Sequence, residues 1–229
     1  MNRAELQEAL RRAGVSDYLY ALPGLRDPER GLESYYFLDD RSGRVVAGAF
    51  ERGRERIGAR FDSEDEACRW LHDELVLAAD GPRKLTADEE ERAKRNADRL
   101  VQEVTALVRR AGQAVQASTT VYQLDRGLIV DQFGQESGTY LYPDGTPFQQ
   151  RSLPPSLLST TDPSFPNNYH RYEIMRPFRA RAGPVAPAFE QPGGGIQFKV
   201  EPEFFAERPP LLTVRWLLRA GYLRRVAAD

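Results

Sequence analysis

Proline and aromatic residues are unevenly distributed along this chain of 229 residues, and this asymmetry limits the folds that it can adopt. Thirteen of the 16 prolines and 15 of the 23 aromatic residues lie after Gly112. Proline interrupts helices and favours turns, whereas aromatic residues favour strands. The sequence therefore predicts an α+β protein in which a helix-rich front half precedes a mostly antiparallel β domain.

Residues 1–82 are predicted to form a small α+β module. Two capping boxes, each a helix-starting pair three residues apart, predict one helix at each end of it. The pairs are Asn2 with Glu5 and Ser63 with Glu66, and the helices are expected to stop at Gly14 and at Asp80-Gly81-Pro82. Between them, β-branched and aromatic runs at 34–40, 44–50 and 56–61 predict two or three antiparallel strands.

Residues 83–112 are predicted to form a connecting helix. Thr86 and Glu89 make a third capping box, and apolar residues then recur at intervals of three and four up to Gly112. The first two turns are almost wholly charged, so they are expected to project into solvent and are assigned no chemistry.

Residues 113–229 alternate between short strand patterns and turns. Strands are expected within 119–124, 127–133, 138–143, 169–175, 184–189 and 196–200. Pro209-Pro210 precedes an amphipathic pattern that predicts a closing helix, capped at Gly221.

Charge and composition exclude several classes of function. The formal net charge is -2, so no global field attracts nucleic acid. The single cysteine, Cys68, and the two distant histidines, His72 and His170, argue against a disulfide framework and a Cys/His metal site. No apolar leader and no 18-residue apolar run occurs, so we expect no membrane partner and synthesis in a cytosol, with signal-independent export left open.

Three consecutive glycines, Gly193, Gly194 and Gly195, precede a strand pattern that contains Gln197. They lack the spacing of a dinucleotide-binding or phosphate-binding loop. One interpretation is a tight turn or bulge; the other is a backbone that a ligand approaches closely, with Gln197 directed at it.

The segment 131–155 interleaves aromatic residues with turns and ends near Arg151. Its aromatic residues are Phe133, Tyr140, Tyr142 and Phe148. Such rings with an arginine suit a nucleotide, by stacking and by phosphate contact, although rings at strand spacing also form cores. His170 allows a structural or a base role, and no carboxylate pair has the spacing typical of a glycosidase.

Taken together, four segments resemble the tuberculosis-necrotizing-toxin type of NAD glycohydrolase domain. They are DQFGQESGTYLYPDGTPFQQRSLPP (131–155), YHRYEIMRPF (169–178), GPVAPAFEQPGGGIQF (183–198) and LLRAGYL (217–223), in the order of the family. The resemblance covers roughly residues 119–229, and residues 1–112 fall outside it.

The resemblance implies hydrolysis of the nicotinamide–ribose bond of NAD or NADP, which are substrates, without a metal or other cofactor. It implies Gln197 as the essential residue, with Tyr140 and His170 in the active site. It further implies substrate contacts from Phe133, Gln132, Arg151 and the glycines 193–195. Gln132 stands where the family usually carries arginine, in a DRFG segment.

We hypothesise that Gln197 orients water or the ribose hydroxyls, that Tyr140 contacts the nicotinamide end, and that His170 and Arg151 hold phosphates. Two alternatives stay open: a degenerate domain that binds NAD or a partner without turnover, and transfer of ADP-ribose to a macromolecule. The resemblance also implies a bacterial toxin with a cognate immunity protein. For residues 1–82, an export adaptor, an autoinhibitory cap and a partner-binding domain are equally compatible.

Overall fold

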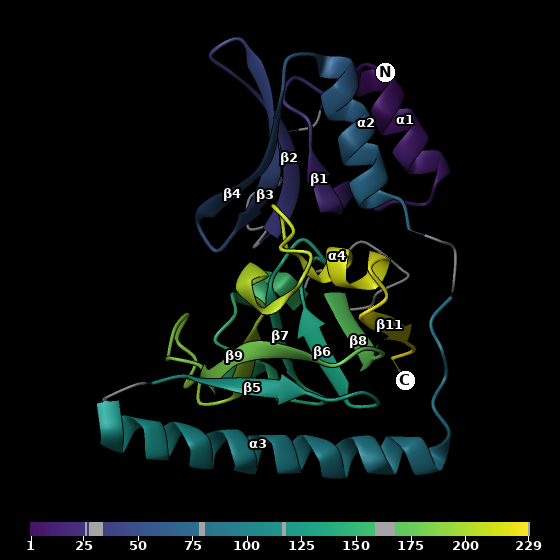
Figure 1. The fold of residues 1–229 in the computed structure, drawn as a ribbon. Coiled ribbons are helices and arrows are strands. Elements are labelled where there is room, and N and C mark those ends of the chain that lie inside the picture. The colour runs from purple at the N-terminus through teal and green to yellow at the C-terminus, as the bar shows by residue number, and fades with distance from the viewer. Residues whose placement is uncertain (26, 28–33, 78–80, 116–117, 159–167, 229) are drawn as a thin grey trace.

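The computed structural model describes residues 1–25, 27, 34–77, 81–115, 118–158 and 168–228. It contains a four-stranded and a seven-stranded sheet, each accompanied by helices (Figure 1). Two helices pack beside the smaller sheet, while a long helix runs along the far side of the larger one. No helix in the described part of the chain has the length and apolar character needed to cross a membrane.

The N-terminal module contains the two predicted helices and three antiparallel strands as predicted, together with an unpredicted short strand that pairs in parallel with the first of them. It consists of α1 (Arg3–Arg12), β1 (Tyr20–Ala21), β2 (Ser34–Arg41), β3 (Arg44–Glu51), β4 (Arg54–Phe61) and α2 (Glu64–Leu75), with the strands in the order β1-β2-β3-β4. The capping box of Asn2 and Glu5 is confirmed, and Ser63 caps α2. The second helix ends at Leu75, and the predicted stop at Asp80 lies outside the described residues.

The C-terminal sheet has the strand order β11-β8-β6-β7-β10-β9-β5. Its strands are β5 (Thr120–Leu124), β6 (Ile129–Phe133), β7 (Tyr140–Pro143), β8 (Tyr169–Ile174), β9 (Phe178–Pro184), β10 (Ile196–Lys199) and β11 (Leu223–Val226). The closing helix is α4 (Val214–Arg219), and short 3-10 helices span Asp17–Leu19, Phe148–Arg151, Pro155–Leu158 and Pro202–Phe204. All the described pairings in this sheet are antiparallel, as predicted.

In the C-terminal sheet, one predicted strand is wrong and two strands were missed. Residues 185–189 form a loop with only an isolated bridge at Ala188, because Pro187 has no N–H and Phe189 takes a positive φ of 53°. The missed strands are β9, whose alternation of arginine with small residues conceals its buried face, and β11, which directly follows the helix-ending Gly221.

The helix α3 (Ala87–Val115) is part of the C-terminal fold. Its capping box is confirmed, since Thr86 and Glu89 exchange both hydrogen bonds, but the helix continues past Gly112. Leu100 and Val104 are fully buried in the core of the large sheet. The expectation that the charged first turns only face solvent is wrong for Glu90, which forms a bidentate ion pair with the buried Arg171 of β8.

Buried polar contacts dock the two modules on each other around α4. The Tyr36 and Thr213 hydroxyls are 2.7 Å apart, and the Arg215 guanidinium donates to the carbonyl oxygen of Leu75. Leu211 packs into the core of the N-terminal module. The front module is therefore held in a defined position relative to the large sheet.

Glu136 is the centre of a buried charge cluster beneath this contact. It is 3% exposed and accepts hydrogen bonds from Arg215 at 2.7 Å and from Arg225 at 2.6 and 2.8 Å. Burial alone would raise the pKa of Glu136, but the charges and hydrogen bonds of the two arginines lower it to about 2.

This shift predicts acid sensitivity. Because the folded-state pKa lies below the unfolded value, the contribution of Glu136 is complete above about pH 4.5 and is lost as pH falls towards 2. Between pH 5 and pH 3, the wild type should lose roughly 2 kcal/mol more unfolding free energy than Glu136→Gln, measured by urea denaturation. Equal losses in both proteins would contradict this role.

Candidate active site

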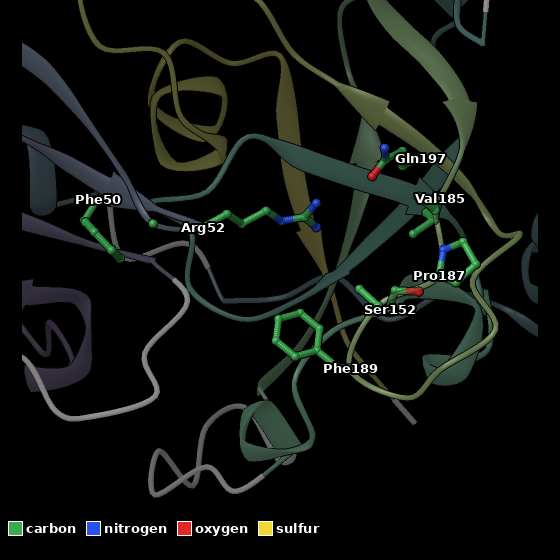
Figure 2. A pocket seen from close by; sticks show the side chains of 10 residues that line it. Phe50, Arg52, Ser152, Val185, Pro187, Phe189 and Gln197 are labelled. Atoms are coloured by element: carbon green, nitrogen blue, oxygen red, sulfur yellow. The ribbon is translucent and has the colours of Figure 1, made fainter.

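A pocket of about 460 Å³ lies between the tip of the β3–β4 hairpin and the C-terminal sheet (Figure 2). Its volume is in the range of small-molecule sites. It is lined by Phe50, Arg52, Gly53, Ser152, Val185, Ala186, Pro187, Ala188, Phe189 and Gln197. One wall thus comes from the N-terminal module, which the sequence does not connect with the site.

Gln197 brings an amide group to this pocket from β10, where it pairs with Gly183 of β9. Its Oε1 is buried and has no hydrogen-bond partner among the described residues. Buried polar atoms are nearly always paired, and exceptions need an explanation. An acceptor kept available for a ligand is such an explanation.

Strand register places three of the five predicted site residues that lie on strands on one face of the sheet. Lys199 pairs with Tyr140, and Asp131 pairs with Tyr142. Since alternate residues share a face, Tyr140 and Phe133 lie on the same side as Gln197. Gln197 lines the large pocket, whereas Phe133 and Tyr140 line a smaller hollow of about 30 Å³ beside Arg52.

Arg151 is on this face, but four hydrogen bonds within the protein already engage its guanidinium. The side chain is 1% exposed and forms a bidentate ion pair with Asp131, at 2.6 and 2.8 Å. Its remaining bonds go to the carbonyl oxygen of Thr146, and its guanidinium stacks on the rings of Phe133 and Tyr142. The geometry therefore supports a structural role and does not agree with the predicted phosphate contact.

His170 and Gln132 are cross-strand neighbours on the opposite face. Gln132 is 2% exposed and donates from Nε2 to the Tyr172 hydroxyl, although it also borders the small hollow. His170 is buried, with Nδ1 3.9 Å from Glu136 Oε1. The structure does not bring His170 to the large pocket, where the phosphate hypothesis would need it.

The three glycines allow close packing of the loops around the pocket. Their N–H groups donate to the backbone carbonyl oxygens of Gln149, Val185 and Gln150, for Gly193, Gly194 and Gly195 respectively. A Cβ on Gly193 would come within 2.6 Å of the Val185 carbonyl oxygen, and its φ is +64°. These contacts agree with a tight turn, which was the first of the two interpretations of the glycines. The backbone N–H groups bond to neighbouring loops and are not directed at a ligand.

Gln197 is the one residue of this pocket lining that was predicted as a site residue, and among those missed Arg52 and Phe50 come from the N-terminal module. The signal was present, because Arg52-Gly53 is a two-residue connection between strand patterns, where a long charged residue is unusual. A search of the described residues for metal sites found no group of three His, Cys, Asp or Glu side chains.

Comparison with known proteins finds a family match in the C-terminal half of the chain. The family model described as tuberculosis necrotizing toxin matches residues 123–226. The match to the necrotizing-toxin domain begins within β5, ends with β11, and leaves out α3 and the N-terminal module.

Two individual proteins each resemble just under half of the chain. Over 100 residues, 44% of this chain, the identity is 45% to the conidial surface nicotinamide adenine dinucleotide glycohydrolase nadA of Aspergillus fumigatus. The match spans 38% of that relative's length. A solved structure of tuberculosis necrotizing toxin, complexed with its immunity factor, is 29% identical, with a TM-score of 0.36 over 48% of this chain and 56% of that one.

Proposed function

We propose that this protein hydrolyses the bond between nicotinamide and ribose in NAD, releasing nicotinamide and ADP-ribose. The observation that carries the proposal is the 45% identity over 100 residues to a relative named as an NAD glycohydrolase, together with the match of residues 123–226 to the necrotizing-toxin family. The pocket with its buried amide oxygen supports it, because its volume suits part of a dinucleotide.

The chemistry of this bond fits the residues at the pocket. Nicotinamide leaves an N-ribosyl pyridinium as a neutral molecule, so no general acid is needed, unlike in ordinary glycoside hydrolysis. No carboxylate lines the pocket among the described residues. In our proposal, Oε1 of Gln197 accepts a hydrogen bond from the attacking water or a ribose hydroxyl, which fixes the reacting geometry as the ribose gains positive charge.

The aromatic residues have supporting roles in this proposal. The Arg52 guanidinium lies 3.9 Å from the ring centroid of Tyr140, so one face of that ring is covered. Tyr140 therefore helps to build the site beside Gln197, while Phe133 packs against Tyr169 and Phe148 beneath it. His170 and Gln132 support the strands from the opposite face.

The test is incubation of the purified chain with NAD and with NADP in the presence of a chelator, followed by chromatography. We expect equimolar nicotinamide and ADP-ribose, or its phosphate from NADP, with unchanged rates on metal removal. Intact NAD with measurable binding would instead establish a degenerate binding domain. Labelled ADP-ribose on protein would establish transfer.

The place of action is part of the same proposal. The relative is named for the conidial surface, so we propose that this chain also acts outside the cell that makes it. An immunity protein that blocks the pocket is the partner expected for a toxin. Fractionation of the producing cells, with detection of the chain outside them, tests the location.

A further inference from the structure

We infer that Arg52, from the N-terminal module, binds the pyrophosphate of the substrate and so completes a site that the necrotizing-toxin domain alone leaves without a free cation. The inference rests on the proposed function. Its first support is composition, because Arg52 is the one charged side chain among the described residues that line the large pocket.

The Arg52 guanidinium has donors to spare. It makes one hydrogen bond, to the Tyr142 hydroxyl at 3.0 Å, and lies over the Tyr140 ring. Among the described residues, no carboxylate forms an ion pair with it, in contrast to the buried Arg151, which is paired with Asp131. An arginine has five N–H donors and binds phosphate in a bidentate manner, so most of this capacity remains available to a ligand. Figure 2 shows the side chain directed into the space that Gln197 also faces.

The backbone at Arg52 supports a function for this side chain. Arg52 and Gly53 connect β3 to β4 with φ values of 49° and 77°. This left-handed geometry favours asparagine or glycine at the first position, and a long side chain there is strained. Strain of this kind is concentrated at functional sites.

Hydrogen bonds fix the tip of the β3–β4 hairpin in position against the C-terminal fold. The Glu51 carboxylate accepts hydrogen bonds from the backbone N–H and hydroxyl of Thr139, at 2.6 and 2.7 Å. Arg56 donates to the carbonyl oxygens of Ser137 and Leu212. These contacts flank Arg52 on both strands, so its side chain reaches the pocket from a fixed base.

The variant Arg52→Asn separates binding from folding, because asparagine fits the turn better than arginine. We expect its melting temperature to stay within a few degrees of the wild type, while the KM for NAD rises about 10- to 100-fold and kcat changes little. The Kd for ADP-ribose should weaken by a similar factor. The matched control is Arg54→Asn, which removes an exposed arginine of the same hairpin that does not line the pocket and should change neither constant.

An unchanged KM for NAD, or a loss confined to kcat, would overturn the assignment of Arg52 to the phosphates. If the wild type releases no nicotinamide, the proposed function fails, but ADP-ribose binding still decides this inference. Binding that weakens in Arg52→Asn and not in Arg54→Asn supports it. Equal binding in all three proteins, or no binding by the wild type, refutes it.

Discussion

Replacing Gln197 with alanine should lower kcat/KM for NAD about 10²- to 10³-fold, the loss typical for removal of one preorganised polar group from an active site. The pocket contains no other side-chain amide among the described residues that could take over the contact. Nicotinamide release under saturating and limiting NAD measures the effect. The melting temperature should not fall, because Oε1 of Gln197 is unpaired in the fold and its loss removes no intramolecular bond at that atom.

The control for this prediction is Gln123→Ala. It makes the same truncation on β5 of the same sheet, at an exposed position outside the pocket, and should leave kcat/KM unchanged. Gln197→Glu tests whether the amide group itself is needed. It keeps the shape of the side chain and replaces the NH₂ donor of the amide by a carboxylate oxygen. Turnover by Gln197→Ala at the wild-type rate would remove Gln197 from the mechanism.

Much of the fold was predictable because the local signals are strong and independent of tertiary context. Capping boxes at Asn2 and Thr86 set helix starts by hydrogen bonds within one turn, and the structure contains them. The failures have two causes. At 185–189 the local effect of Pro187 and of the positive φ of Phe189 outweighs the strand pattern. At Glu90 a distant contact decides, because this side chain pairs with Arg171, which is 81 residues away along the chain.

The candidate site was predictable in part, for a similar reason. Gln197 lies in a contiguous motif, residues 183–198, so it can be recognised as a site residue from the sequence alone. Whether a basic side chain contacts a ligand depends on which partner it meets, and tertiary packing, within a module or between modules, sets that partner. Arg151 was expected at the ligand and is bound to Asp131, while Arg52 reaches the pocket across a boundary that composition alone does not bridge.

Arg151→Met should lower the unfolding free energy by about 3 to 5 kcal/mol, because it leaves the fully buried carboxylate of Asp131 without its counter-charge. Asp131 would keep its bonds from the Gly145 N–H and the Tyr169 hydroxyl, but these do not neutralise a charge in an apolar environment. Urea denaturation at pH 7 measures the loss.

The double variant Asp131→Asn with Arg151→Met should recover part of that stability, since no buried charge remains, and a double-mutant cycle gives the coupling between the two side chains. The same variants distinguish a structural role of Arg151 from a phosphate contact. A structural role requires a large coupling free energy between Arg151 and Asp131. Wild-type stability in Arg151→Met, together with a raised KM for NAD, would return Arg151 to the ligand, because a phosphate contact contributes to binding and not to the free energy of unfolding.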